Sequence, residues 1–450
     1  MTQTYHDHFV RSGQHFERAR HVLPGGVTRS LSAWPPHPVY VHSGEGAFVS
    51  DLDGHRLLDL NNNYTALVLG HAHPEVVRVV TEQIKKGTSF AFSTELEVEL
   101  AEMLVERVPS VERVRFVSSG TEAAMFALRT ARAATGRSKI AKMECGYHGA
   151  HDDAAVSVRP KLEDAGPPER PRSVCEVDGL IAGGTDNVVV LPFNRPAEAI
   201  ELIREHADDL AAVIVEPVLG VGGMIPAVAA FLPALRQACT EHGIVLIFDE
   251  VITLRLAPGG AQEISGVTPD LTIMGKVIGG GLPIGALGGS AALMEMYDPY
   301  KAGAGGPRMF QAGTFTGNPM SLAAGIVTLR ALTPEVCVDL NTHGDRIRQQ
   351  LGALFEDLQL PAVVTGTGSL FNVHMTAGPV VTPRDAWAID VPRQLRFFLD
   401  LLSRGVVLAP RGMGAVSTAM TDADINFFLE EAGEVASLLS KSGDPGRVAA

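Results

Sequence analysis

Residues 244–251 read Ile244-Val245-Leu246-Ile247-Phe248-Asp249-Glu250-Val251. An apolar run of this length is typical of a strand that is buried on both faces of a sheet. Its last residues include carboxylates, and a buried carboxylate needs a cation or a hydrogen-bond donor beside it. Ligands of open α/β sheets bind outside the carboxyl ends of the strands. We therefore expect Asp249 to face a cationic ligand, although an acid that only caps the next loop would give the same pattern.

Helical and strand patterns alternate on both sides of this run, from about residue 94 onward. Thr94 and Glu97 have the spacing of a capping box, which marks the start of the first helix. The expected strands are 114–117, 187–193, 211–218 and 244–251, and the expected helices after the first are 122–134, 197–210, 231–243 and 319–332. This alternation predicts an α/β domain with a mostly parallel sheet.

The chain is expected to divide into three parts. Residues 71–332 form the large α/β domain, residues 333–450 form a smaller α+β domain with strands at 363–375 and 406–409, and residues 1–70 pack beside the small domain. Between Arg159 and Asp186 lies a segment with several Pro and Gly residues that is too long for a routine connection. It is a candidate lid or binding loop, and a passive surface insertion is an equally good interpretation.

The composition is that of a globular protein. Of 450 residues 46% are hydrophobic and 20% charged, and the 51 acidic and 37 basic residues give a formal charge of −14. Without a Lys/Arg-rich run, this charge argues against nucleic acid or an anionic membrane as a partner. The four cysteines include no CxxC pair, so we expect neither a disulfide framework nor a metal site. The polar N-terminal stretch, and the lack of an apolar run long enough to span a bilayer, predict a cytoplasmic location.

A lone lysine follows the next apolar stretch. Ile273-Met274-Gly275-Lys276 is succeeded by Gly279-Gly280-Gly281, so Lys276 lies between a strand and a flexible turn. Desolvation lowers the pKa of an amine and leaves it free to form an imine. Taken alone, Lys276 is more simply a surface lysine whose stem covers apolar surface. Asp249 changes this weighting, because a carboxylate beside a pyridinium nitrogen keeps such a ring protonated and electron-withdrawing.

Two further features could serve a flat anionic cofactor. Ser119-Gly120-Thr121 is a turn that leads from a strand into a helix, and backbone N–H groups, a hydroxyl and the helix dipole there all favour phosphate. Such turns are common, and no GxxxxGK[ST] loop occurs in the chain. Tyr147 follows Gly146 at the end of another expected strand and could stack on a ring. A core aromatic residue is an equally good interpretation of Tyr147.

Taken in order, these motifs resemble those of class III aminotransferases, which are pyridoxal-phosphate enzymes of fold type I. The resemblance extends over nearly the whole chain, from Pro24-Gly25-Gly26 to the last helix. It is carried by Ser118-Ser119-Gly120-Thr121-Glu122-Ala123, Gly146-Tyr147-His148-Gly149, Glu216-Pro217, Phe248-Asp249-Glu250-Val251, Gly275-Lys276 and Gly313-Thr314-Phe315-Thr316-Gly317-Asn318-Pro319. It implies the fold-type-I architecture, with a large domain around a mostly parallel sheet and a smaller α+β domain.

The resemblance also implies roles for individual residues. Lys276 would carry pyridoxal phosphate as a Schiff base and move the proton, Asp249 would pair with the pyridine nitrogen, and Tyr147 would stack on the ring. The other residues implied to bind the cofactor are Ser119, Gly120, Thr121, Glu216 and Val251. Thr314 matches a position that reaches the phosphate from the neighbouring subunit. A homodimer with shared active sites is therefore expected.

Within the family, the chain most resembles β-amino-acid aminotransferases such as β-phenylalanine aminotransferase, and glutamate-1-semialdehyde aminomutases. Arg29 and Arg411 match arginines that bind carboxylates in the β-phenylalanine enzymes, and the planar fork of arginine suits a carboxylate. A surface salt bridge is the alternative for either. Asn63, beside Tyr64, departs from the acidic residue of those enzymes, and 66–71 instead resembles a D-phenylglycine aminotransferase. Ser32 stands where the aminomutases have a carboxylate-binding arginine, although the 159–186 segment resembles their gating loop.

We therefore expect a ping-pong transaminase that acts on small molecules. A β- or aromatic amino acid would give its amino group to pyridoxal phosphate, and a keto acid such as 2-oxoglutarate or pyruvate would receive it. The expected substrate-binding residues are Arg29, Asn63, Tyr64 and Arg411. A glutamate-1-semialdehyde-type 2,1-aminomutase ranks second, and a racemase of the same fold third. A non-catalytic binding protein should have lost Lys276 or Asp249, and the chain has both.

Overall fold

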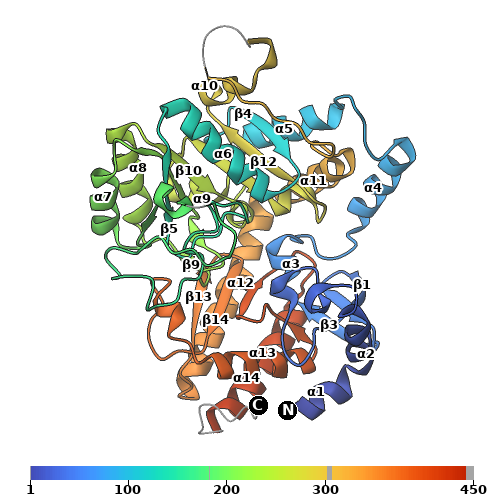
Figure 1. Ribbon diagram of the computed structural model, residues 1–450. Coiled ribbons are helices and arrows are strands. Elements are labelled where there is room, and N and C mark those ends of the chain that lie inside the picture. Colours follow the sequence, from blue (N-terminus) through green and yellow to red (C-terminus); the bar gives the residue numbers. More distant parts are fainter. Residues whose placement is uncertain (1, 182, 302–306, 442–450) are drawn as a thin grey trace. The chain divides into compact units, whose positions relative to one another are not determined.

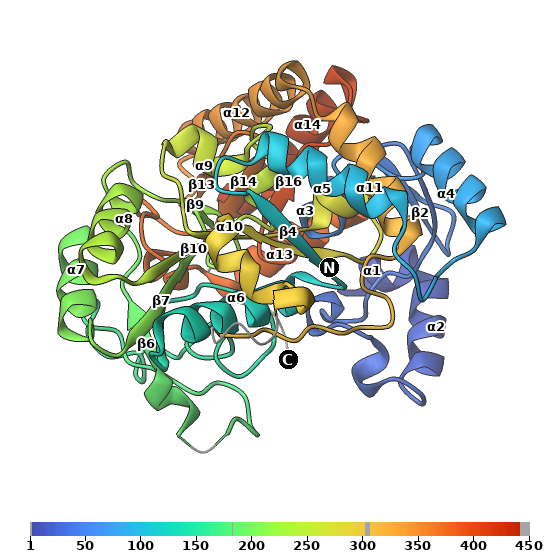
Figure 2. The same cartoon turned by 90° about the horizontal axis from the view of Figure 1, so that it is seen from above.

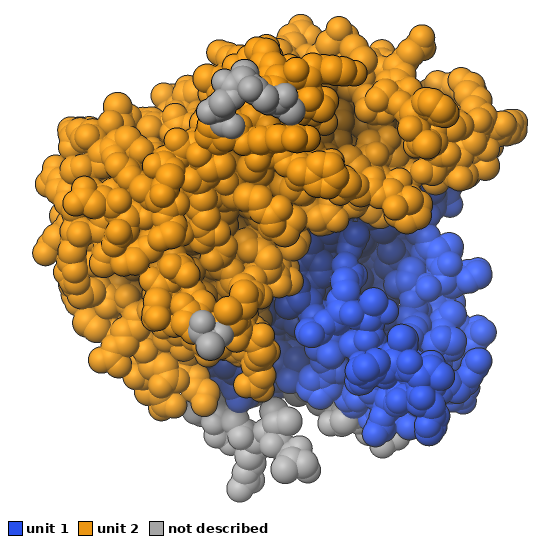
Figure 3. Space-filling model, turned by 45° about the horizontal axis from the view of Figure 1, so that its top comes forward, with its two compact units in different colours: residues 1–74, 340–379, 388–450 blue, residues 75–339, 380–387 orange. Residues whose placement is uncertain are grey.

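The chain forms two compact units. The computed structural model describes residues 2–181, 183–301 and 307–441 (Figure 1). Unit 1 comprises residues 1–74, 340–379 and 388–450, and unit 2 comprises residues 75–339 and 380–387 (Figure 3). The expected boundary near residue 333 thus lies close to the change of unit after Asp339.

Unit 2 is built around a mixed sheet whose strands follow the spatial order β4-β12-β11-β10-β7-β5-β6. The strands are β4 (Arg113–Val117), β5 (Lys139–Met143), β6 (Val188–Leu191), β7 (Leu210–Val215), β10 (Val245–Asp249), β11 (Leu271–Gly275) and β12 (Gly285–Gly289). All neighbouring pairs are parallel except those of β12, which is antiparallel to β4 and β11. The α/β class and the mostly parallel sheet are confirmed.

The antiparallel strand β12 is absent from the sequence prediction, because its sequence Gly285-Ala286-Leu287-Gly288-Gly289 is mostly glycine. Glycine is depleted in strands, so the pattern indicates a turn. The structure gives the reason for two of these glycines. A Cβ on Gly285 would lie 2.1 Å from the carbonyl oxygen of Ser119, and one on Gly288 would lie 2.7 Å from the Val111 side chain. Close packing at these points excludes a larger residue.

Helices cover both faces of this sheet. Helix α6 (Gly120–Thr135) crosses one face, while α5 (Glu95–Arg107) and α11 (Pro319–Ala331) lie on the other side of β4 (Figure 2). The remaining helices of unit 2 are α4 (Pro74–Lys86), α7 (Pro196–Glu205), α8 (Phe231–His242), α9 (Gly260–Ser265) and α10 (Ala291–Met294). The expected helix 197–210 is too long, because α7 ends at Glu205 and Leu210 already begins β7. The expected strand 211–218 ends at Val215 and is followed by Glu216 and Pro217, which lacks a backbone donor.

One short segment of the C-terminal region, residues 380–387, clusters with unit 2, and the expected three-part division of the chain stays a prediction. Residues 380–387 contain Arg384, whose guanidinium donates to both carboxylate oxygens of Glu144, at 2.9 and 2.8 Å. The same group donates to the carbonyl oxygens of Gly166, at 2.7 Å, and Ala165, at 3.1 Å. Bidentate arginine–carboxylate pairs are strong and directional. Arg384 therefore ties this segment to the long connection after β5.

Unit 1 holds two small sheets with the orders β1-β2-β3-β15 and β13-β14-β16. The strands are β1 (Val41–Glu45), β2 (Phe48–Asp51), β3 (Arg56–Asp59), β13 (Val363–Thr367), β14 (Leu370–His374), β15 (Val406–Val407) and β16 (Met413–Ala415). The helices are α1 (Thr2–His8), α2 (Val10–Ala19), α3 (Asn62–Thr65), α12 (Pro334–Asp357, which begins in unit 2), α13 (Val391–Ser403) and α14 (Asp422–Lys441). The expected strand 363–375 is in fact a hairpin, because Gly368 takes a left-handed turn with φ 51°.

No single helix within the described ranges has the length and apolar character needed to cross a membrane. Helices α11 and α12 meet that criterion only as a pair, and they are bent by 79° relative to each other.

Candidate active site

Asp249 is the last residue of β10, at the carboxyl end of the central part of the sheet. It is only 6% exposed. Its Oδ2 lies 2.8 Å from His148 Nδ1, and its Oδ1 accepts the Val251 N–H at 3.1 Å. The carboxylate is thus buried, oriented by two contacts, and placed where a cationic ligand is expected.

Lys276 follows β11, the strand beside β10, and begins the 3-10 turn η5 (Lys276–Gly279). Its φ of 50° lies in the left-handed region, which is rare for a residue with a Cβ and is typical of functional sites. Burial lowers the pKa of the amine to about 8, with Arg255 acting in the same direction and Asp249 and Glu216 opposing it. A much larger fraction of neutral, nucleophilic amine is therefore present at neutral pH than on an ordinary lysine.

Glu216 and Tyr147 are joined through the backbone. The Glu216 carboxylate accepts the Tyr147 N–H at 2.9 Å and the Gly220 N–H at 3.0 Å, and the residue is 4% exposed. Burial raises the pKa of Glu216, and Asp249 acts in the same direction. The Tyr147 side chain is 44% exposed, so its ring is available to a ligand while its backbone is held.

The expected anion cradle forms the N-terminus of α6. Ser119 is the N-cap, and its hydroxyl accepts the Glu122 N–H at 3.2 Å. Close contacts hold the turn to its neighbours. A Cβ on Gly120 would lie 3.2 Å from Val251, and one on Gly149 would lie 2.6 Å from Thr121 Oγ1. The helix N-terminus, with its N–H groups and dipole, is thus packed against the loop that follows Asp249.

His148 is a candidate functional residue that the sequence prediction did not single out. It is 2% exposed, and its Nε2 has no hydrogen-bond partner among the described residues. Its Nδ1 contact with Asp249 places it behind that carboxylate, where it can fix the carboxylate's orientation. Its position next to Tyr147 was the available signal, but nothing in the sequence alone pairs it with Asp249.

These features bring together three complementary groups within unit 2. A buried carboxylate can hold a protonated ring nitrogen, an amine of lowered pKa can attack a carbonyl, and a helix N-terminus can hold a phosphate. The positions of Asp249 and Lys276 at the ends of neighbouring strands, the Ser119–Thr121 turn and the exposed Tyr147 fit pyridoxal phosphate. The roles of the individual residues stay predictions.

The expected substrate residues lie in unit 1, and three of them are in contact. Arg29 Nη1 donates to Asn63 Oδ1 at 2.8 Å, and the Arg29 guanidinium carbon lies 5.8 Å from the centroid of the Tyr64 ring. Arg411 is exposed, and its carbonyl oxygen accepts from the Asn372 amide at 3.1 Å. Carboxylate binding by Arg29 and Arg411 stays a prediction.

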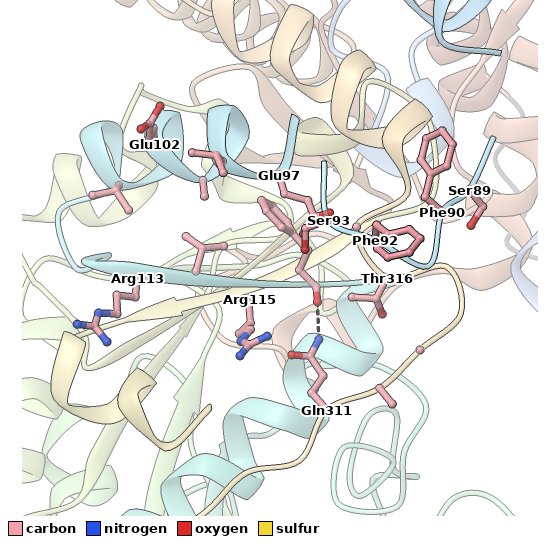
Figure 4. Close-up of a pocket in the computed structure, with 18 of the residues that line it drawn as sticks. Ser89, Phe90, Phe92, Ser93, Glu97, Glu102, Arg113, Arg115, Gln311 and Thr316 are labelled. Carbon is pink, nitrogen blue, oxygen red and sulfur yellow. Dashed lines mark hydrogen bonds between the residues drawn. The ribbon is translucent and has the colours of Figure 1, made fainter. Parts of the chain in front are cut away.

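Thr314 lines an open cavity of about 1370 Å³ in unit 2, and none of the expected substrate residues lines this cavity. Figure 4 shows Phe92 near Thr316 in this cavity, with Arg113 and Arg115 farther along β4. The Gln311 amide donates a hydrogen bond to the Phe116 carbonyl oxygen at 2.5 Å. Phe92 is 86% exposed, and Phe90 and Thr314 are exposed as well. The cavity thus combines polar groups with large apolar side chains that nothing in the described chain covers.

Comparisons with known proteins agree on one family. A family model described as aminotransferase class-III matches residues 31–430. The glutamate-1-semialdehyde 2,1-aminomutase of Methanothermobacter thermautotrophicus is 44% identical over 431 residues, which cover 95% of this chain and 99% of that protein. The resemblance drawn from the motifs is confirmed. The curated relatives favour the aminomutase, which ranked second in the sequence prediction, over the β-amino-acid transferase.

Solved structures of transaminases are also similar. An ω-transaminase from Sphaerobacter thermophilus is 42% identical, with a TM-score of 0.91 over 96% of this chain and 98% of that one. A transaminase with PLP bound is 38% identical, with a TM-score of 0.87 over 97% and 99% of the two chains. A β-phenylalanine aminotransferase from Variovorax paradoxus is 37% identical, with a TM-score of 0.85 over 96% of each chain. The fold-type-I architecture is confirmed.

Proposed function

The chain belongs to the class III aminotransferases, and on this premise we propose that it transfers the amino group of a β- or aromatic amino acid to a keto acid such as 2-oxoglutarate or pyruvate. It is an enzyme of fold type I that acts on small amino and keto compounds, and its cofactor is pyridoxal phosphate. The observation that carries the proposal is that Asp249 and Lys276 lie at the ends of neighbouring strands, while Val251, two residues after Asp249, packs against Gly120 at the N-terminus of α6.

The cofactor, when bound, supplies a carbonyl that takes up the amino group and a ring that delocalises the electrons of a broken C–H bond. The chain supplies the proton transfers. Lys276 Nζ would take the proton from the carbon that bears the amino group and pass it to the cofactor's carbonyl carbon, and it would reverse this transfer in the second half-reaction, since its lowered pKa suits both tasks near neutral pH. Asp249 would hold a proton on the ring nitrogen, and His148, 2.8 Å from that carboxylate, would keep it oriented.

One feature of unit 1 supports intermolecular transfer over the mutase reaction. Arg29 and Ser32 line the same cavity, of about 560 Å³. In the aminomutases the position of Ser32 is expected to hold an arginine that binds the substrate carboxylate, and a serine hydroxyl cannot supply a charged fork. Arg29 is then the cation of this cavity that can receive a carboxylate, as in the β-phenylalanine aminotransferases.

The 2,1-aminomutase is the second candidate, and the curated relatives are the observation that favours it. The two reactions differ in their need for an acceptor, because a mutase returns the amino group to the same molecule. A racemase would instead exchange the Cα hydrogen without accumulating the pyridoxamine form of the cofactor.

The need for a keto acid separates these functions. We expect the enzyme loaded with pyridoxal phosphate to consume β-phenylalanine continuously only when 2-oxoglutarate or pyruvate is present, and to stop after one equivalent per active site without it. Glutamate-1-semialdehyde with no keto acid is the control substrate. Continuous isomerisation of that compound, together with no turnover of β-phenylalanine, would contradict the transaminase and support the mutase. Amine consumption and product formation are followed by chromatography.

We further propose that the enzyme is a homodimer whose active sites are shared. The exposed Phe90, Phe92 and Thr314 line a cavity that a second copy can fill. Large exposed apolar groups beside a cavity are typical of an interface. The cytoplasmic location also stays a prediction, with which the four free thiols are compatible.

Substitution of Phe92 by aspartate tests the dimer. A charge at this exposed position would have to be desolvated in the interface, so we expect the light-scattering mass to change from two chains to one and kcat to fall at least about tenfold. Phe310→Asp, at an exposed position outside the cavity lining, is the matched control. A wild-type enzyme with the mass of one chain, or a Phe92→Asp variant that stays dimeric and active, would contradict the shared site.

A further inference from the structure

Helix α3 of unit 1 is a left-handed turn rather than an ordinary helix. Asn62, Asn63, Tyr64 and Thr65 have φ values of 50°, 49°, 54° and 76°. Side chains with a Cβ disfavour this conformation, and asparagine tolerates it better than most. Four such residues in succession persist only where neighbouring groups fix them, and strain of this kind is concentrated at ligand sites.

Side chains around the turn fix its backbone. Asp59 Oδ1 accepts the N–H groups of Asn61, at 2.9 Å, and Asn62, at 3.0 Å. The Asn61 amide oxygen accepts the Tyr64 N–H at 2.6 Å. The Asn62 side chain is fully buried, and its amide donates to the Ala415 carbonyl at 2.6 Å. Hydrogen bonds from Asp59, Asn61 and the Ala415 carbonyl therefore fix the conformation of the turn.

The turn places two side chains against Arg29. Asn63 Oδ1 accepts from Nη1 of Arg29 at 2.8 Å, and the Tyr64 ring lies 5.8 Å from the guanidinium carbon. The Tyr64 hydroxyl donates to the Leu31 carbonyl at 2.9 Å, which fixes the ring. An exposed arginine would otherwise sample many rotamers. Here Asn63 holds one edge of the guanidinium, and the Tyr64 ring lies against it.

The charge of this arginine is not neutralised by the walls of its cavity. The cavity of about 560 Å³ is lined by Arg29, Asn63 and Tyr64 among others, and its acidic wall residue is Asp59. The Asp59 carboxylate is held by other partners, with Oδ2 2.8 Å from His71 Nε2 and Oδ1 accepting the N–H groups of Asn61 and Asn62. Asn63 is a neutral acceptor, so it orients the guanidinium without cancelling its positive charge. The cavity wall therefore suits an anion with an apolar body.

We infer that Asn63 is the positioning residue for a substrate carboxylate, because it aims the Arg29 guanidinium and, being neutral, leaves its charge to the substrate. An acidic side chain at this position would pair with Arg29 in a bidentate fashion and compete with the carboxylate. The inference rests on the proposed function, in which Arg29 receives the carboxylate of the amino donor. The inference adds that the side chain of residue 63 decides how strongly the enzyme prefers a substrate with a carboxylate over an uncharged one.

The variant Asn63→Asp tests the inference by binding and by kinetics. The binding probe is 3-phenylpropanoate, with uncharged 3-phenylpropanamide as its partner, and both are measured by titration calorimetry on the holoenzyme. We expect the Kd of the carboxylate to rise about 10- to 100-fold and that of the amide to change less than about twofold. KM for β-phenylalanine should rise by a similar factor while kcat changes less than about threefold, since the lost contact acts on binding.

Two further variants keep the test decisive. Asn63→Gly retains the left-handed backbone that glycine adopts freely and removes only the amide, so we expect a severalfold rise in the Kd of the carboxylate. Asn187→Asp, at an exposed position of unit 2, makes the same charge change elsewhere and should leave both Kd values unchanged. Unchanged carboxylate binding in both Asn63 variants, with thermal melting like that of the wild type, would overturn the inference.

Failure of the inference and failure of the proposed function give different results. A wild-type enzyme that transfers the amino group of β-phenylalanine, with Asn63→Asp equally selective for the carboxylate, refutes the positioning role alone. A wild-type enzyme that transfers no amino group from any carboxylate-bearing donor refutes the proposed function. In that case a rise in the Kd of 3-phenylpropanoate in Asn63→Asp would still support the positioning of Arg29.

Discussion

Replacement of Lys276 by alanine is expected to abolish turnover, with kcat at least about 10³-fold lower, while pyridoxal phosphate still binds weakly. The lysine can both take up and release a proton near neutral pH, because burial lowers the pKa of its amine to about 8. Phosphate and ring contacts at the Ser119–Thr121 turn and at Asp249 do not depend on it. The measurement is steady-state transfer from the best amino donor, with cofactor content determined by absorbance.

Lys142 provides a matched control, because burial lowers the pKa of its amine to about 8 as well. It differs in geometry. Its side chain is fully buried in β5, and its Nζ donates to the carbonyl oxygens of Val156, at 2.7 Å, and Met143, at 3.3 Å. We expect Lys142→Met, which keeps an unbranched stem, to retain transfer. Normal turnover by Lys276→Ala would refute the assignment.

Replacement of Asp249 by asparagine should lower both kcat and kcat/KM by about 10²- to 10³-fold, which is the usual loss when a buried group that stabilises charge is removed. The amide keeps the size of the carboxylate but has no charge with which to hold a proton on the ring nitrogen. An NH₂ group would also replace one of the two carboxylate oxygens. These oxygens lie 2.8 Å from His148 Nδ1 and 3.1 Å from the Val251 nitrogen. The check is the same transfer assay at saturating donor.

The exposed Asp209, whose carboxylate pairs with Lys139 at 3.0 Å, is the control for charge loss. Asp209→Asn should leave kcat within about twofold of the wild type, since exposed ion pairs contribute little. An Asp249→Asn enzyme that keeps most of its activity would contradict a role for the carboxylate at the ring nitrogen.

The parts of the fold that the sequence predicts are those with strong local patterns. The apolar run before Asp249 is a buried strand, and α8 and α11 end within one residue of their expected bounds. The Glu97 carboxylate accepts the Thr94 N–H at 2.9 Å, as the capping-box spacing indicates. In these segments propensity, periodicity and capping all favour the same structure.

The misses come from contacts that no local pattern contains. Strand β12 is rich in glycine because other chain segments press against it, and a Cβ at Gly285 would strike the Ser119 backbone. Residues 380–387 cluster with unit 2 because Arg384 binds Glu144, far away in the sequence. The left-handed turn at Asn63 depends on Asp59 and Ala415 in the same way.

The candidate site shows the same division. Lys276 and Asp249 could be singled out by residue type and position, because an amine and an acid end neighbouring strands. The contact of His148 with Asp249 could not, because it depends on how the segment after β5 meets the end of β10. Likewise, the sequence does not show that Asn63 is the neutral partner of Arg29, because this depends on the hydrogen bond between them.

Borohydride reduction of the enzyme loaded with pyridoxal phosphate, followed by peptide mass mapping, tests directly which lysine holds the cofactor. We predict that the pyridoxyl mass is found on the peptide that contains Lys276, and that Lys142→Met gives the same adduct. A pyridoxyl group on Lys142 or on any other lysine, or a protein that takes up no pyridoxal phosphate, would contradict the assignment.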